Sequence, residues 1–167
     1  MTFRKSKSDL RIHAFCDVDW TSSTADRRSI TGYHISLTEH GPPISWKSKK
    51  QASVALSTCE AEYVSLSITC QEIIYLARLV NELIEHDLQP TTIKNDNQGA
   101  LSLIKNHPVK HSKSKHIDIR YHFIREVYSG GLIVLDYVPS EENIAYIFTK
   151  PPKRHLLTKF GQFLFGQ

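Results

Sequence analysis

Alternating apolar and polar side chains divide the first third of the chain into short extended segments. Between Arg11 and Asp17 both alternating sets of side chains are fairly apolar, which is typical of a central strand that is buried on both faces. A second strand and then a third strand or bent pair follow, at Ser29–Thr38, Ile44–Lys49 and Ala52–Leu56. Three successive strands with short connections favour an antiparallel meander.

After Leu56 the apolar spacing changes to that of a helix. Ser57 is a good N-cap, and Glu60 three residues later completes a capping box, in which Glu60 reaches back to the N–H of Ser57. Steps of four and three from Glu62 trace one apolar face, through Leu66, Thr69, Ile73, Leu76, Val80 and Leu83. We expect this helix to run from Ser57 to about His86, because Pro90 bars its continuation.

The second half of the chain alternates strands with helices. Strands are predicted at Thr91–Asp96 and Leu132–Val138, and helices at 97–105, 115–129 and 140–149, with Asn97 and Ser140 as caps. Strands that are joined through helices favour parallel pairing, so the fold class is α/β. We expect a lead-in at residues 1–9, one domain at residues 10–150 that includes a basic linker over 106–114, and a loosely held C-terminal tail at residues 151–167.

Glu62 is the unusual member of the apolar helix face. A carboxylate on such a face is costly unless another group pairs with it. Three alternatives stay open: an arginine or lysine neutralises Glu62, the residue lies beyond the edge of the core, or it faces other acids and a metal ion. Glu60 needs no such explanation, because it has a capping role.

Asp17 and Asp96 are candidates for those other acids. Each ends a predicted strand, and the carboxyl ends of strands in α/β sheets are where sites assemble. Three converging carboxylates repel one another unless a cation is present, and magnesium is the natural cation for oxygen ligands. Two such ions about 4 Å apart would suit phosphodiester hydrolysis. The alternative is that these aspartates serve only in loops and caps.

Composition narrows the class of protein. The chain has 167 residues, 40% of them hydrophobic and 23% charged, which suits one globular domain. Because no apolar run resembles a membrane span or a signal peptide, we expect an intracellular protein, cytoplasmic or nuclear, that is neither secreted nor bound to a membrane. Three cysteines without zinc-like spacing indicate free thiols in a reducing compartment. The net charge of +4 and clustered lysines suit either a phosphate backbone or an ordinary solvated surface.

Motifs along nearly the whole chain carry a family resemblance. They are Phe15-Cys-Asp-Val-Asp-Trp20, Asp26-Arg-Arg-Ser-Ile-Thr-Gly-Tyr33, Ile44-Ser-Trp-Lys-Ser-Lys-Lys-Gln51, Cys59-Glu-Ala-Glu-Tyr63, Asp96-Asn-Gln98, Lys115-His-Ile-Asp-Ile-Arg-Tyr-His-Phe-Ile-Arg-Glu126 and Glu142-Asn-Ile-Ala-Tyr-Ile-Phe-Thr-Lys-Pro151. In this order they resemble the ribonuclease H domain of copia-type retrotransposon Pol polyproteins. The resemblance implies a ribonuclease H-like fold, with a five-stranded mixed sheet of three antiparallel and two parallel strands flanked by helices.

The resemblance also implies an activity. Members of this family hydrolyse the RNA strand of RNA–DNA hybrids as part of a reverse transcriptase, with two Mg²⁺ ions, or Mn²⁺ in their place. The catalytic and metal-binding roles fall on Asp17, Glu62 and Asp96. The implied partners are the hybrid and the polymerase domain of the same polyprotein.

One position departs from the family pattern. The family usually carries a fourth acid in the pattern Asn-(Ile/Val)-Ala-Asp, whereas this chain reads Asn143-Ile-Ala-Tyr146. A neutral tyrosine cannot replace a carboxylate ligand, and we expect it to point at the site and to weaken or crowd one metal position. Asp118 could compensate in part or could serve only the surface. The alternative function is therefore a degenerate, weak or silent domain that at most binds nucleic acid.

Hybrid binding needs small polar groups near the acids and cations farther out. Candidates for the first are Thr58, Asn97 and Gln98, and candidates for the second are Arg27, Arg28, Lys47, Lys49 and Lys50. Each cation has a plain alternative as a solvated surface charge. Trp46 suits strand packing better than base stacking.

Overall fold

The structure is a computed structural model that describes residues 10–20, 26–85, 88, 90–106 and 115–165, without the side chains of 115–118. The expected lead-in at 1–9, the linker residues 107–114 and the side chain of Asp118 therefore lie outside the described residues. Among the described segments, no helix combines the length and the apolar character needed to cross a bilayer.

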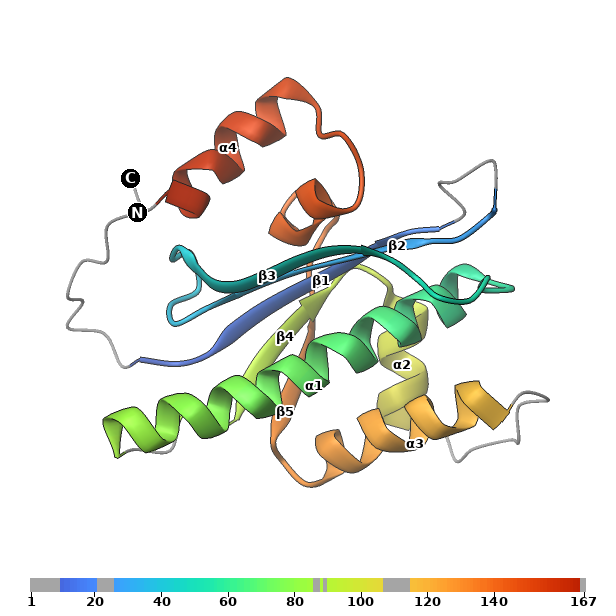
Figure 1. The fold of residues 1–167 in the computed structure, drawn as a ribbon, viewed down its shortest axis with the longest axis horizontal. Coiled ribbons are helices and arrows are strands. Elements are labelled where there is room, and N and C mark those ends of the chain that lie inside the picture. The colour runs from blue at the N-terminus through green and yellow to red at the C-terminus, as the bar shows by residue number, and fades with distance from the viewer. Residues whose placement is uncertain (1–9, 21–25, 86–87, 89, 107–114, 166–167) are drawn as a thin grey trace.

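A five-stranded mixed sheet forms the centre of the molecule (Figure 1). Its strands are β1 (His13–Asp19), β2 (Ile30–Ser36), β3 (Pro43–Lys50), β4 (Thr91–Asn95) and β5 (Ile133–Tyr137). Their order is β3-β2-β1-β4-β5, with antiparallel pairing from β3 to β1 and parallel pairing from β1 to β5. The expected meander and the expected parallel strands are both confirmed, and β1 is the central strand.

Helix α1 (Thr58–Ile84) begins at the predicted capping box. The hydroxyl of Ser57 accepts a hydrogen bond from the N–H of Glu60 at 3.1 Å. The carboxylate of Glu60 accepts from the N–H of Leu56 at 2.8 Å, one residue earlier than expected. The predicted apolar face is buried as far as Leu76, but Leu83 is 74% exposed, because the helix runs past the edge of the core.

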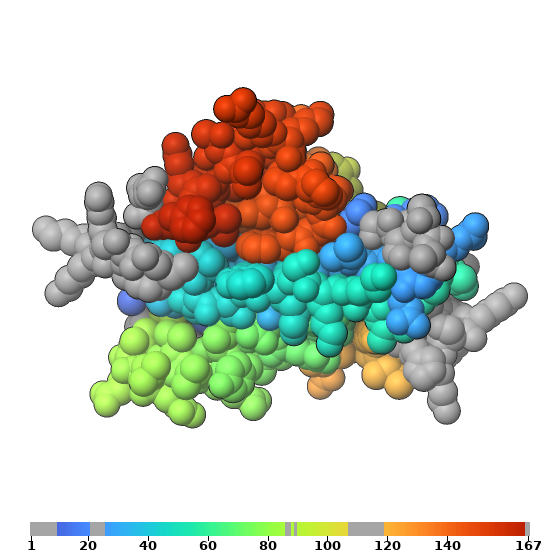
Figure 2. Space-filling view, turned by 45° about the horizontal axis from the view of Figure 1, so that its top comes forward, coloured from blue at the N-terminus to red at the C-terminus, as the bar shows by residue number. Residues whose placement is uncertain are grey.

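Two layers of helix cover the sheet (Figure 1). Helices α1, α2 (Gln98–Asn106) and α3 (Lys115–Ser129) lie on one face over the larger core. The short 3₁₀ helix η1 (Ile144–Phe148) and helix α4 (Arg154–Phe165) lie on the other face. There they form a second apolar cluster with β1, made of Phe15, Val138, Ile144, Ala145, Leu156 and Phe160. Figure 2 shows this C-terminal layer in orange and red above β3.

Three predictions about local structure are wrong. The expected helix over 140–149 is only η1, and its cap is Asn143 rather than Ser140. The tail expected to be loosely held forms α4, because Leu156 and Phe160 bury themselves in the second cluster. Residues 52–56 form no strand.

The residue after the third strand, Gln51, anchors the connection to α1. Gln51 is buried, and its amide nitrogen donates to the hydroxyl of Thr31 and to the carbonyl of Ala61, both at 3.0 Å. These two bonds tie the connection to β2 and to the first turns of α1. The start of α1 is therefore held against the sheet by a side chain that no periodicity marks.

His34 is fully buried on the face of the sheet that carries η1, edge-on to Phe15. Neither ring nitrogen has a hydrogen-bond partner among the described residues. Burial lowers the pKa of His34 from 6.5 to about 4, because the charged imidazolium is poorly solvated there.

We expect the contribution of His34 to the stability of the metal-free protein to be lost as the pH falls from about 6.5 to 4, because the unfolded chain takes up a proton that folded His34 refuses. His34→Leu should remove on the order of 2 kcal/mol of this loss. Urea unfolding of the wild type and of His34→Leu at pH 7, 5.5 and 4 measures this pH-dependent loss of stability. His122→Leu, at an exposed position of α3, is the control. If the free energy of unfolding of His34→Leu depended on pH as it does in the wild type, the prediction would be contradicted.

Candidate active site

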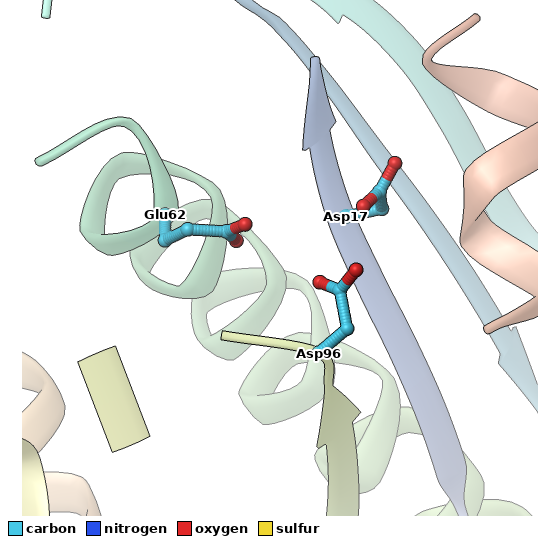
Figure 3. A group of neighbouring side chains, drawn as sticks. All are labelled: Asp17, Glu62 and Asp96. Atoms are coloured by element: carbon cyan, nitrogen blue, oxygen red, sulfur yellow. The ribbon is translucent and has the colours of Figure 1, made fainter. Parts of the chain in front are cut away.

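Three carboxylates meet at the end of the sheet where β1 and β4 finish (Figure 3). Asp17 projects from β1, Asp96 follows β4 directly, and Glu62 enters from the second turn of α1. One oxygen from each carboxylate lies within 4.8 Å of an oxygen from each of the others. The sequence had placed Asp17 at the last position of its strand, but β1 continues to Asp19.

Side chains, rather than backbone pairing, join β1 to β4 beside these acids. The parallel register of β1 with β4 covers His13–Phe15 and Thr92–Lys94. Beyond it, the carbonyl of Cys16 accepts from the Asn95 amide at 3.2 Å and from the Asn143 amide at 2.8 Å. The hydroxyl of Ser65 on α1 donates to the carbonyl of Asp17 at 3.0 Å. The backbone of β1 is therefore held from three directions at the residues that position Asp17.

Glu62 is 5% exposed and faces the two aspartates. Of the three alternatives raised for it, the structure agrees with a residue that faces other acids. The amide of Asn95 donates to its Oε2 at 2.9 Å. Burial, reinforced by the charges of Asp17 and Asp96, raises the pKa of Glu62 from 4.5 to about 8, and the Asn95 bond opposes this shift.

Asp17 is buried as well, with a pKa raised by burial from 3.8 to about 6. The hydroxyl of Thr149, just after η1, donates to its carboxylate and opposes the shift, while the charge of Asp96 adds to it. On the other side of the site, the hydroxyl of Ser140 donates to the carboxylate of Asp96. Each acid therefore has its own polar partner.

The close approach of η1 to the sheet depends on Gly32. This residue pairs with Asp17 across the antiparallel ladder, so it lies beside the acids. A Cβ atom at Gly32 would lie 2.7 Å from Cγ2 of Thr149 and 2.9 Å from both the Ala145 carbonyl and Cβ of Phe148. Only glycine leaves room for Thr149 to reach Asp17.

The donors suit a hard divalent cation. All three are carboxylates, and among the described residues none of them forms an ion pair with a lysine or arginine. Burial, with a smaller contribution from the neighbouring acids, raises the pKa values of Asp17 and Glu62, and a bound cation would favour their ionised forms. Asp17, Glu62 and Asp96 could therefore hold a magnesium ion.

The small polar candidates lie at helix starts near the acids. Thr58 is exposed at the first position of α1, and Gln98 is exposed at the first position of α2. Asn97 is the N-cap of α2, since its side-chain oxygen accepts from the N–H of Ala100 at 2.9 Å. Asn97 therefore has a structural role beside any role toward a ligand.

The candidate cations do not share one surface. Residues directly opposite one another in the ladder point to the same face. Lys47 and Lys49 pair with Tyr33 and Thr31 and so lie on the α1 face, where Lys47 sits 5.6 Å from the centre of the Tyr33 ring. Lys50 lies on the face of Asp17 and pairs with Asp26 at 3.2 Å.

The remaining residues considered in the sequence are two arginines and one tryptophan. Arg27 and Arg28 are exposed in the turn before β2. Trp46 is 61% exposed and stacks on Phe148, with ring centres 5.7 Å apart, so it packs on a sheet face rather than in the core.

Tyr146 packs against the second apolar cluster. Among the described residues, its hydroxyl makes no hydrogen bond to the three acids. The supporting roles of Asn95, Asn143 and Thr149 do not follow from local patterns, since each contacts a residue at least 33 positions away. A polar residue within a buried strand, as at Asn95, is the one signal that could have pointed to them.

No protein-family model matches this chain. Its sequence is 39% identical over 160 residues to the retrovirus-related Pol polyprotein from transposon RE2 of Arabidopsis thaliana, over 96% of this chain and 11% of that protein. It is 40% identical over 159 residues to the corresponding polyprotein from transposon RE1 of the same plant, over 95% of this chain and 11% of that protein. The chain thus spans about a ninth of the length of these relatives.

Among solved structures, the fold is similar to that of LC11-RNase H1, isolated from compost by a metagenomic approach. The TM-score is 0.60 at 15% identity, over 84% of this chain and 93% of that chain. The complex of the same enzyme with an RNA/DNA hybrid gives a TM-score of 0.58 at 14% identity, over 83% and 94% of the two chains. The similarity at this level of identity concerns the fold.

Proposed function

The chain belongs with the ribonuclease H-like segments of retrovirus-related Pol polyproteins from copia-type transposons, and from this premise we propose that it hydrolyses the RNA strand of RNA–DNA hybrids. The observation that carries the proposal is the convergence of Asp17, Glu62 and Asp96 within 4.8 Å at the carboxyl ends of β1 and β4. We propose magnesium as the ion, held by these three acids. The hybrid bound by LC11-RNase H1 supports the choice of substrate.

Each residue of the site has a task in this proposal. A divalent ion held by Asp17, Glu62 and Asp96 would supply an activated water and would stabilise the leaving oxygen of a phosphodiester. Asp17 and Glu62 must be ionised to bind it, and the hydrogen bonds from Thr149 and Asn95 favour that ionised state. Ser140 orients Asp96. We assign contacts with the backbone of the nucleic acid to Thr58 and Gln98, which are exposed at two helix starts.

The test is cleavage of an end-labelled RNA–DNA hybrid in magnesium. We expect cleavage by the wild type, none in EDTA, and none above background from Asp17→Asn, because the amide cannot serve as an anionic ligand. Asp136→Asn, at an exposed position of β5, is the matched control and should cleave like the wild type.

The alternative, a silent domain, has one observation in its favour, the tyrosine at position 146. Absence of cleavage from a folded wild-type protein would support it. Double-stranded RNA and double-stranded DNA should remain intact, and equal cleavage of either would contradict specificity for the hybrid.

A further inference from the structure

Strand β3 carries a row of exposed side chains on the face of the sheet that holds Asp17. Ladder partners point to the same face, and Asp17 pairs with Gly32, which in turn pairs with Ser48. Trp46 and Lys50 point the same way as Ser48, because side chains alternate along a strand. We call Trp46, Ser48 and Lys50 the β3 row, and all three are exposed. Since β3 is the outer strand of the sheet, the row lies at its edge, below the C-terminal layer (Figure 2).

The indole of Trp46 is held flat at this surface. It stacks on the ring of Phe148, with ring centres 5.7 Å apart and an angle of 14° between the planes. The residue is nevertheless 61% exposed. One face of the indole therefore packs on Phe148, while the other faces solvent. A fixed aromatic ring with an open face is the kind of platform on which a nucleobase stacks.

Helix η1 connects the β3 row to the three acids. Phe148 is the last residue of η1, and the hydroxyl of the next residue, Thr149, donates to the carboxylate of Asp17. Neighbouring strands lie about 4.8 Å apart, so the backbones of Asp17 and Ser48, two strands apart in register, are separated by about 10 Å. A nucleic-acid strand that passes the acids therefore reaches the row within a short distance, past the end of η1.

The chemistry of the row suits an unpaired strand. It offers an aromatic face for a base, and a hydroxyl and an ammonium for phosphates, at intervals of about 6.6 Å. Lys50 pairs with Asp26 at 3.2 Å, but surface pairs of this kind are weak, so the ammonium can also contact a phosphate. The bases inside a duplex are already stacked on their neighbours. A base that stacks on Trp46 must therefore come from a single-stranded segment.

We propose that the β3 row binds the single-stranded extension of the RNA strand, where that strand continues beyond the hybrid. The inference rests on the proposed function, because the acids must hold the RNA strand beside the row. In this arrangement Trp46 stacks on one unpaired base and Lys50 contacts a phosphate of the same segment. The extension adds affinity and takes no part in hydrolysis.

The experiment compares hybrids that share one duplex: a blunt hybrid, hybrids with a four-nucleotide RNA extension at the 5′ or the 3′ end, and hybrids with the same extensions on the DNA strand. Every RNA strand is blocked against hydrolysis, and fluorescence anisotropy gives the dissociation constants of the full chain. We expect one of the two RNA extensions to tighten binding at least about fivefold over the blunt hybrid, which is the contribution of one base stacked on an aromatic side chain.

Variants of the row test which side chains produce this gain. Trp46→Leu should lose the gain, and Trp46→Phe, which keeps an aromatic ring, should retain most of it. Tyr75→Leu is the matched control and should retain all of it, because Tyr75 is an aromatic side chain of α1 with a similar exposure of 62%. Since the gain is a ratio measured within one variant, a general loss of stability cancels.

The phosphate contact has its own readout. An RNA extension that reaches Lys50 should make binding more dependent on salt than it is for the blunt hybrid. Lys50→Met should remove this difference in salt dependence, whereas Lys49→Met, which removes a charge from the opposite face of β3, should leave it unchanged.

The outcomes separate this inference from the proposed function. Equal affinities of the wild type for the blunt and both RNA-extended hybrids would overturn the inference alone. So would a full gain in Trp46→Leu, or an equal gain from an extension of the DNA strand. A wild type that binds the blunt hybrid no better than double-stranded DNA of the same length, and leaves an unblocked hybrid intact, would overturn the proposed function itself.

Discussion

Glu62→Gln should abolish hybrid cleavage and, without metal, make the protein more stable than the wild type at pH 9. Folded Glu62 holds its proton up to about pH 8, whereas an unfolded glutamate releases it near 4.5. The contribution of Glu62 to the stability of the wild type therefore falls as the pH rises from about 4.5 to 8, and it stays low above that window. Asp17, with a pKa of about 6, adds to the fall in the same direction.

Glutamine imitates the protonated acid. Its side-chain oxygen can still accept the bond from Asn95, which is 2.9 Å long in the wild type. We expect a gain in the free energy of unfolding of up to about 4 kcal/mol at pH 9 and almost none at pH 4. Loss of an anionic ligand should lower cleavage by at least about a thousandfold.

Denaturant unfolding in EDTA at pH 4, 7 and 9 measures the gain in the free energy of unfolding. Glu82→Gln, an exposed position of the same helix, is the control and should follow the wild type. Adding Mg²⁺ at about a hundred times its dissociation constant should stabilise the wild type by about 2.7 kcal/mol and leave Glu62→Gln nearly unchanged. Parallel pH profiles for wild type and Glu62→Gln would show that Glu62 is ionised in the folded protein at neutral pH.

Gly32→Ala should damage the site although residue 32 carries no chemistry. The new methyl group would meet Cγ2 of Thr149 at 2.7 Å, and the Ala145 carbonyl, at 2.9 Å, belongs to backbone that cannot rotate away. Helix η1 must therefore shift from β1, which breaks the bond from Thr149 to Asp17. We expect a loss of about 1–3 kcal/mol of stability from overpacking and of at least about tenfold in cleavage.

Gly161→Ala provides the control. It lies in α4 and its new Cβ would meet nothing within 4 Å, so a neutral or slightly stabilising effect is expected. Thermal unfolding and the hybrid assay measure both variants. Wild-type cleavage by Gly32→Ala would show that the contact between Thr149 and Asp17 is dispensable.

Local signals in the sequence were enough to predict α1 and the acids. Ser57 and Glu60 mark the start of the helix, and the spacing from Glu62 to Leu76 marks its buried face. Parallel strands bring their carboxyl ends to one edge, so Asp17 and Asp96 could be expected near each other.

The C-terminal quarter was harder to predict, for physical reasons. A 3₁₀ helix of five residues is too short to show a period, so η1 could not be told from a longer helix. Leu156 and Phe160 are buried against residues that are distant in the sequence, such as Phe15 on β1. The alternation along β3 sends Lys47 and Lys50 to opposite faces of the sheet, as the strand period of two predicts, so the candidate cations do not share one surface.

The bonds from Asn143 to Cys16 and from Thr149 to Asp17 span 127 and 132 residues. During synthesis the first two acids have left the ribosome long before the segment that orients Asp17. The sheet of β1 to β3 and α1 can pair earlier, through contacts that are closer in the chain. The site is therefore completed late in synthesis, and a partly made chain that ends before η1 lacks the Thr149 hydroxyl that orients Asp17.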